Sequence, residues 1–188
     1  MSEYGKGYFA WRDQNIDETE WHDILKILRE KFPDARKVLE VGCGTGNLMM
    51  FLSQHGYDVT GVDISSYAVE VCRKRGLKAI LSDAENLPFP QSSFDVVISQ
   101  HLLEHLANPI RGIRESVRVS RGGCIHIVPG HWSKDPTHIV NHFTRPFLED
   151  LLRLISYEAP IKSYEILLDS VSRMDVTLTD YIIIIYKL

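Results

Sequence analysis

The residues best suited to bind a ligand follow three short β-prone runs of the sequence. The first run ends in Glu40-Val-Gly-Cys-Gly-Thr-Gly46, where glycines remove the Cβ at points at which a backbone turns sharply or approaches a ligand closely. The amides of such a loop and of the helix after it form a concave, mildly positive surface. A simple tight turn would have the same composition. The spacing is G-x-G-x-G rather than the G-x-G-x-x-G of dinucleotide-binding proteins, which argues against NAD or FAD.

Carboxylates follow the next two β-prone runs. Asp63 could accept hydrogen bonds from both hydroxyls of a ribose, and Ile64 beside it could offer an apolar face to a purine. Asp83 could accept a bond from an exocyclic amine, while the amide of Ala84 could donate to a ring nitrogen. Each acidic residue alone is equally compatible with a helix cap or an Asx turn. Their occurrence at successive strand ends is more specific and indicates an adenosine-containing ligand.

Short strands alternate with helices along the chain and would position these residues. The β-prone runs are 37–41, 57–62, 77–81, 94–99 and 124–128, and the helical stretches are 17–32, 47–55, 66–75 and about 101–120, with a break near Pro109. This alternation predicts an α/β fold with a doubly wound, mostly parallel sheet. Ligands of such sheets bind beyond the carboxyl ends of the strands. A helix at about 145–155 precedes two late runs, 164–171 and 181–188, which we expect to pair as an antiparallel hairpin.

Composition places the chain among ordinary globular proteins. It has 188 residues and a formal charge of −4, and its three cysteines form no C-x-x-C pair, which indicates reduced thiols. No run is long and apolar enough to cross a bilayer, and the first residues lack the apolar core of a secretory signal. We therefore expect a cytoplasmic protein without membrane insertion. A broad basic surface is absent, although a local patch could form from Arg111, Arg114, Arg118 and Arg121.

Several segments in order resemble one family. The stretch VLEVGCGTG (Val38–Gly46) resembles the first motif of the class I S-adenosylmethionine-dependent methyltransferases, and GVDIS (Gly61–Ser65) is similar to that family's ribose-binding strand end. The run Asp83–Ser99 is similar to its adenine-contacting loop and fourth strand. The resemblance is close from Lys37 to Pro129 and looser in the tail, and it is nearest to the small-molecule, methyltransferase-11-like type. It implies a Rossmann-like methyltransferase fold with seven strands, the last one antiparallel.

The resemblance also implies roles for individual residues. Glu40 and the glycine loop would take the methionine part of S-adenosylmethionine, Asp63 its ribose, and the residues after the second and third strands its adenine. Gln100 would face the sulfonium, and Tyr8 or a neighbouring aromatic residue would close the site. The full set of expected cofactor-binding residues is Tyr8, Glu40, Gly42, Cys43, Gly44, Gly46, Asp63, Ile64, Asp83, Ala84 and Gln100.

The domain organisation expected from the resemblance is simple. One methyltransferase domain would cover residues 1–188. Within it, residues 1–33 would supply an N-terminal cap segment and the first helix, and residues 129–144 would form a lid over the acceptor site.

Histidines are the candidate catalytic residues, because a base is needed only when the acceptor must lose a proton. His101 and His105 are spaced i, i+4 and would share a helix face if that segment is helical. We take His101 as a candidate base and expect His105 to pack or cap. His138 is the second candidate base, in a region that in similar proteins lies over the acceptor. The further residues expected to line the acceptor pocket are His131, Trp132 and His142.

His138 and His142 are again spaced i, i+4, which is a spacing compatible with a metal site. The chain lacks an HExxH motif and a nearby cysteine partner, so we expect no metal there.

These features predict an enzyme that transfers a methyl group from S-adenosylmethionine to an unidentified small molecule, glycan or lipid precursor. The N-P-P-Y-type motif of enzymes that methylate base or amide nitrogens is missing after the fourth strand, which with the acidic charge argues against a nucleic-acid partner. A homodimer is compatible with the sequence. The alternative is a non-catalytic cofactor-binding module that acts as partner or regulator of another protein.

Overall fold

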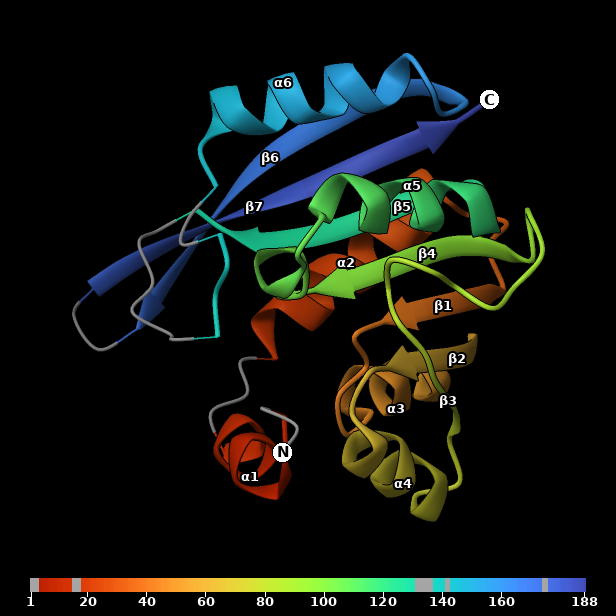
Figure 1. Cartoon of the computed structure of the whole chain (residues 1–188), viewed down its shortest axis with the longest axis vertical. Coiled ribbons are helices and arrows are strands. Elements are labelled where there is room, and N and C mark those ends of the chain that lie inside the picture. Colours follow the sequence, from red (N-terminus) through yellow and green to blue (C-terminus); the bar gives the residue numbers. More distant parts are fainter. Residues whose placement is uncertain (1–3, 15–17, 131–136, 141–142, 174–175) are drawn as a thin grey trace.

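A seven-stranded sheet forms the centre of the computed structural model, which describes residues 4–14, 18–130, 137–140, 143–173 and 176–188 (Figure 1). The strand order is β3-β2-β1-β4-β5-β7-β6. The strands are β1 (Lys37–Val41), β2 (Asp58–Asp63), β3 (Lys78–Leu81), β4 (Phe94–Gln100), β5 (Ser120–Pro129), β6 (Ile161–Arg173) and β7 (Val176–Lys187). β1 to β5 pair in parallel, whereas β7 is antiparallel to both of its neighbours. The predicted fold class is confirmed.

Helices cover both faces of the sheet. The α-helices of the described residues are α1 (Lys6–Gln14), α2 (Thr19–Lys31), α3 (Asn47–Gln54), α4 (Ser66–Lys74), α5 (Pro109–Val119) and α6 (Arg145–Ser156). α2, α3 and α4 bury their apolar sides against one face, and α5 and α6 cover the other. Val38 and Leu39 in β1 are therefore buried on opposite faces, which explains why this strand is a nearly continuous apolar run. In the described part of the chain, no helix is both long and apolar enough to span a bilayer.

The loops that follow the parallel strands leave the sheet at one edge. In Figure 1 the arrowheads of β1, β2 and β4 point to the side on which α1 lies. The two late strands are longer than the sequence predicted: β6 and β7 continue to pair beyond Pro129, the last residue of β5. The N-terminal region contains two helices rather than one, because α1 precedes the predicted helix. The sequence of α1 shows no hydrophobic periodicity, because most of its residues are polar and only Phe9 is buried.

The segment after β4 differs from the predicted helix. His101 has a left-handed backbone with φ of 50°, which ends regular structure, and only a single 3-10 turn, η1 (Leu103–His105), follows before α5. Asn108 caps α5 by accepting a hydrogen bond from the N–H of Arg111 at 3.1 Å, and Pro109 occupies the first turn. His101 and His105 therefore do not lie on one helix face, and this prediction was wrong.

A buried histidine in the sheet makes stability depend on pH. The Nδ1 atom of His126 lies 2.7 Å from the Oγ atom of Ser99, and burial lowers the pKa of His126 to about 4. An unfolded histidine has a pKa of about 6.5, so the unfolded chain binds the proton first as the pH falls. The stability is complete above about pH 6.5 and is lost progressively toward about pH 4.

We expect His126→Gln, which keeps a partner for Ser99, to remove this dependence. Between about pH 7.5 and pH 5 the wild type should lose about 2 kcal/mol of unfolding free energy more than the variant. Urea unfolding at the two pH values measures this difference. The exposed histidine His22 provides the control, because His22→Gln should leave the wild-type pH dependence in place. Equal losses in wild type and His126→Gln would contradict the assignment.

Candidate functional site

A cavity of about 470 Å³ lies at the carboxyl ends of the parallel strands. Its volume falls in the range of about 300–1,000 Å³ that is common for small-molecule sites. The cavity wall includes His101, His138 and every residue predicted to bind the cofactor except Gly46. Gly46 instead packs inside the fold, where an added Cβ would overlap Leu77 and lie 2.9 Å from Cys72.

Two glycines of the loop after β1 lie at the cavity wall and have backbone angles that favour glycine. Gly42 and Gly44 have φ angles of +76° and +52°, in the left-handed region that side chains disfavour. A Cβ on Gly42 would lie 2.9 Å from Leu102, and one on Gly44 would lie 3.3 Å from Phe9. The N–H groups of Gly42 and Cys43 donate to the carbonyl of Val62 at 2.8 and 3.0 Å, so the loop is attached to the end of β2.

Asp63 joins two loops at the end of β2. Its Oδ2 atom accepts a hydrogen bond from the N–H of Gly44, and its Oδ1 atom accepts one from the N–H of Ser65, both at 2.8 Å. Burial raises the pKa of Asp63, and the two N–H groups offset only part of that effect. The side chain is 8% exposed and faces the cavity. The result is an oriented carboxylate at the cavity wall.

Glu40 is a buried carboxyl group with one oxygen still available. It is 4% exposed, and its Oε2 atom accepts no hydrogen bond from the residues that the structure describes. Burial raises the pKa of Glu40 well above its usual value, and the nearby Cys72 and Asp63 add to this effect. A buried acceptor without a donor costs about 1–3 kcal/mol. An ammonium group in the cavity would supply both a donor and a compensating charge.

The loop after β3 supplies the next part of the wall. The Oδ1 atom of Asp83 accepts a hydrogen bond from the N–H of Glu85 at 2.8 Å. This Asx turn fixes the side chain of Asp83. Ala84 and Ile64 line the cavity beside it. Ile64 is 63% exposed, as expected for an apolar side chain that a ligand would cover.

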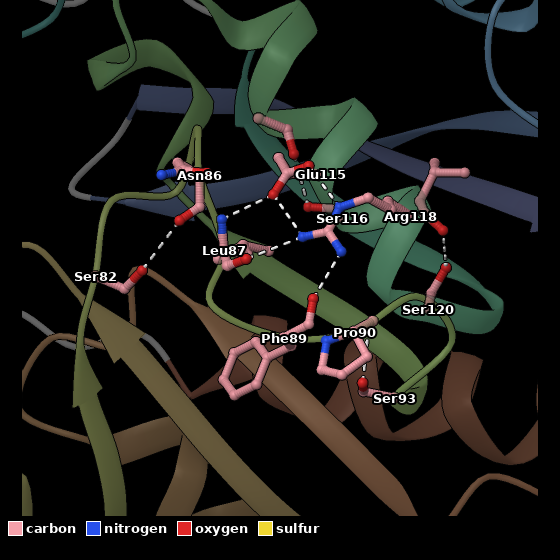
Figure 2. Close-up of polar contacts among 12 residues, drawn as sticks. Ser82, Asn86, Leu87, Phe89, Pro90, Ser93, Glu115, Ser116, Arg118 and Ser120 are labelled. Atoms are coloured by element: carbon pink, nitrogen blue, oxygen red, sulfur yellow. Dashed lines mark hydrogen bonds and ion pairs between the residues drawn. The ribbon is translucent and has the colours of Figure 1, made fainter.

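Arg118 of α5 holds the distal part of this loop in place (Figure 2). Its guanidinium donates to the carbonyls of Phe89 and Leu87 at 2.6 and 2.9 Å, and to both carboxylate oxygens of Glu115 at 2.7 Å. Glu115 in turn accepts a hydrogen bond from the N–H of Leu87 at 2.8 Å. These bonds fix a loop that contains two prolines and no regular structure.

Carboxylates pair with three arginines of the patch suggested by the sequence. The pairs are Arg114–Glu158, Arg118–Glu115 and Arg121–Asp95. Most of the positive charge of this patch is therefore neutralised within the chain.

The N-terminal helix α1 covers the cavity and is tied to the glycine loop. The Oδ1 atom of Asp13 accepts hydrogen bonds from Thr45 Oγ1 at 2.7 Å and from Asn47 Nδ2 at 2.9 Å. The hydroxyl of Ser65 donates to the carbonyl of Tyr4 at 2.7 Å. The aromatic residues of this segment on the cavity wall are Tyr4, Tyr8, Phe9 and Trp11.

His101 lies between two buried carboxylates. Its Nε2 atom is 3.1 Å from Glu20 Oε2, and its Nδ1 atom is 3.5 Å from Glu104 Oε1. Burial alone would lower the pKa of His101, but the two carboxylates outweigh it and raise the pKa to about 10. An imidazolium has no lone pair with which to take a proton. The geometry therefore favours His101 as a fixed positive charge. Gln100 also donates to Glu20.

His105 and His138 face each other at the carboxyl ends of β4 and β5. Their ring centroids are 4.7 Å apart and their planes are nearly perpendicular. The Nδ1 atom of His105 is 3.1 Å from the carbonyl of Thr137, and the N–H groups of residues 139 and 140 donate to the carbonyl of Glu104. The other residues expected at the acceptor pocket, His131, Trp132 and His142, lie outside the described residues, as does most of the predicted lid.

Sequence reasoning missed four carboxylates at the site. Glu20 lies on the apolar side of α2, four residues before Ile24, and this misplaced charge was a detectable signal. Glu104 and Asp180 are also almost fully buried and line the cavity. Asp13 belongs to a helix that the sequence did not predict. Glu20, Glu104 and Asp180 make the cavity acidic at the end near His101 and His138.

Comparison with known proteins finds a family match for the central part of the chain. Residues 39–128 match a family described as a methyltransferase domain. An uncharacterized protein of Methanocaldococcus jannaschii is 36% identical over 128 residues, which cover 68% of this chain and 59% of that protein. The ajmaline N-methyltransferase of Rauvolfia serpentina is 34% identical over 120 residues, which cover 56% of this chain and 41% of that enzyme. The chain thus spans less than two thirds of either relative.

A solved structure with the same fold covers nearly the whole chain. It is the 1,6-didemethyltoxoflavin-N1-methyltransferase of Burkholderia thailandensis, with 1,6-didemethyltoxoflavin and S-adenosylhomocysteine bound. The TM-score is 0.71 at 19% identity, and the match covers 99% of this chain and 84% of that one. At this identity the likeness concerns the fold.

Proposed function

We propose that this chain, whose residues 39–128 match a methyltransferase domain, is a class I S-adenosylmethionine-dependent methyltransferase that transfers the methyl group of that cofactor to a small-molecule acceptor. Glycans and lipid precursors belong to the candidate acceptors. The observation that carries the proposal is the meeting of the β1, β2 and β3 ends around one cavity whose far end is lined by histidines and carboxylates.

The cavity residues fit S-adenosylmethionine at several points. The available oxygen of buried Glu40 suits the amino group of the methionine part, and the absence of a side chain at Gly44 leaves room for close approach. Asp63 is oriented to accept hydrogen bonds from ribose hydroxyls. Ile64 and Asp83 line the cavity, and we expect them to offer an apolar face and a polar edge to adenine.

The chain's contribution to the reaction would be alignment and exclusion of water. When bound, S-adenosylmethionine supplies a methyl group on a positive sulfonium that is already a good leaving group. Holding two aligned reactants together can lower a barrier by roughly 7–11 kcal/mol. α1, fixed by Asp13 to Thr45 and Asn47, would shield the reacting atoms from solvent.

The described histidines would then have different roles. His101 neutralises part of the charge of Glu20 and Glu104 and so holds this wall together. His138 presents an imidazole at the acceptor end. Its nitrogen would meet either the proton that the acceptor loses or a cation bound beside the acceptor.

A screen of acceptors tests the proposal. The protein is incubated with S-adenosylmethionine and a panel of alcohols, phenols, amines and thiols, and mass spectrometry detects acceptors that gain one CH₂ together with S-adenosylhomocysteine. We expect at least one acceptor class to be methylated. Cofactor binding without transfer across the panel would contradict the proposal and favour the regulatory alternative.

His138→Ala should separate acceptor chemistry from cofactor binding. Because His138 faces the acceptor end, we expect kcat to fall by about 10²–10⁴-fold, the usual contribution of a proton-transfer group. Calorimetry should give an unchanged affinity for S-adenosylhomocysteine. The exposed His55 supplies the control His55→Ala, which should keep full activity. Wild-type turnover in His138→Ala would exclude His138 from the reaction.

A further inference from the structure

We propose that Glu104, His105 and His138 form a divalent transition-metal site at the acceptor end of the cavity. One carboxylate oxygen and one ring nitrogen from each histidine all lie within 4.8 Å of one another. Two histidines and one carboxylate are a common ligand set for Zn²⁺ and Fe²⁺ at sites that keep coordination positions open. All three residues line the cavity, so the open positions would face an acceptor.

Glu104 supplies an observation that itself points to a ligand. The residue is 1% exposed, and its Oε2 atom has no hydrogen-bond partner within the described ranges of the chain. Its other oxygen is 3.5 Å from His101. A buried carboxylate oxygen that remains unsatisfied is costly, and a metal ion between Glu104 and the two histidines would satisfy it.

His105 is oriented as metal-binding histidines usually are. Its Nδ1 atom is 3.1 Å from the carbonyl oxygen of Thr137, to which a ring N–H can donate. A backbone carbonyl on one ring nitrogen fixes the tautomer that leaves the lone pair of the other nitrogen for the metal. The same hydrogen bond connects η1 to the segment that carries His138.

That segment is held in place by further backbone contacts. The N–H groups of Ile139 and Val140 donate to the carbonyl of Glu104 at 2.8 and 3.0 Å. His138 is thereby attached to the same short turn that contains the other two proposed ligands. Such an arrangement places three ligands before any ion binds, which lowers the entropic cost of binding.

A second triplet in the same cavity is a weaker candidate. Glu20, His101 and Asp180 also offer atoms within 4.8 Å of one another. However, both ring nitrogens of His101 already face carboxylates, Glu20 on one side and Glu104 on the other. No nitrogen of His101 is left for a metal. Glu20 and Asp180 add negative charge near the proposed site, and His101 offsets part of it.

The role of the metal ion in methyl transfer rests on the proposed function, whereas the existence of the metal site does not. An acceptor hydroxyl bound to the ion would have a lowered pKa and lose its proton to solvent more readily. Its oxygen would then form the new O–C bond while the S–C bond of the sulfonium breaks. Sequence spacing did not indicate this site, because His138 lies far from Glu104 and His105 along the chain.

Metal titration of the full chain tests the proposal. After dialysis against a chelator, Zn²⁺ is titrated by calorimetry, and Co²⁺ is titrated by its visible absorption. We expect about one ion per chain and a Co²⁺ spectrum typical of nitrogen and oxygen ligands. His138→Ala and Glu104→Gln should each weaken Zn²⁺ binding by at least about 10–100-fold, because even loss of a supporting residue has that effect.

Controls make the outcomes distinct. His22→Ala and His55→Ala remove exposed histidines elsewhere and should bind Zn²⁺ as the wild type does. Binding of S-adenosylhomocysteine, measured on every variant, reports folding and the proposed function separately. Wild type that binds S-adenosylhomocysteine but no metal would overturn the metal site alone. Folded His138→Ala and Glu104→Gln proteins that keep wild-type affinity for Zn²⁺ would overturn it as well.

Discussion

Asp63→Ala should weaken the binding of S-adenosylhomocysteine by about 100-fold or more, which corresponds to about 3 kcal/mol for the loss of charge-assisted hydrogen bonds. Asp63 is the carboxylate at the end of β2, and its oxygens are oriented by the N–H groups of Gly44 and Ser65. The substitution removes the ribose acceptor and also loosens the glycine loop. Calorimetry with wild type and variant measures the change directly.

The control lies at the opposite end of the same strand. Asp58 is exposed and forms an ion pair with Lys78 at 2.6 Å. Asp58→Ala should leave the affinity for S-adenosylhomocysteine unchanged, because Asp58 is at the amino end of β2, away from the cavity. Equal affinities of Asp63→Ala and Asp58→Ala would contradict the placement of the ribose at Asp63.

Gly44→Ala should strongly weaken cofactor binding while the protein remains folded. With a φ of +52°, alanine at this position costs about 1–2 kcal/mol of unfolding free energy. The new methyl group would lie 3.3 Å from Phe9, so Phe9 and α1 must shift at the cavity wall. We expect a loss of affinity of about 100-fold or more, since an approach of backbone to ligand that only glycine permits is blocked.

Gly76→Ala is the matched control for this change. Gly76 also has a left-handed backbone, with a φ of +77°, but no atom lies within 4 Å of the position of an added Cβ. Both variants should therefore lose a similar amount of unfolding free energy in urea titrations, and only Gly44→Ala should lose affinity. If Gly76→Ala lost affinity to the same extent, general strain rather than the glycine loop would be responsible.

The central fold was predictable because local and long-range signals agree there. β1 is a short apolar run bounded by Gly42, and it is buried on both faces as a central parallel strand must be. Ser65 caps α4 through its side chain, as a serine directly before a helix commonly does. The polar helix α1 gave no such periodic signal. It is held by contacts with the glycine loop, such as Asp13 with Thr45, that sequence spacing cannot reveal.

One part of the candidate site was also predictable from the sequence, and another part was not. Glu40, Gly44, Asp63 and Asp83 lie at strand ends, and parallel strands bring their carboxyl ends to one edge, so their meeting at the cavity followed from the fold. The environment of His101 did not, because Glu20 is far away in the sequence. Only tertiary packing places that carboxylate beside the ring, where it raises the pKa of His101 and favours a positive charge over a base.

A crystal structure with S-adenosylhomocysteine bound tests the central claim most directly. The account predicts density in the cavity beneath α1, with the amino group of the ligand at Glu40, its ribose hydroxyls at Asp63, and its adenine between Ile64 and the loop after Asp83. Density at another place on the molecule, or in the cavity with the ribose away from Asp63, would contradict the account.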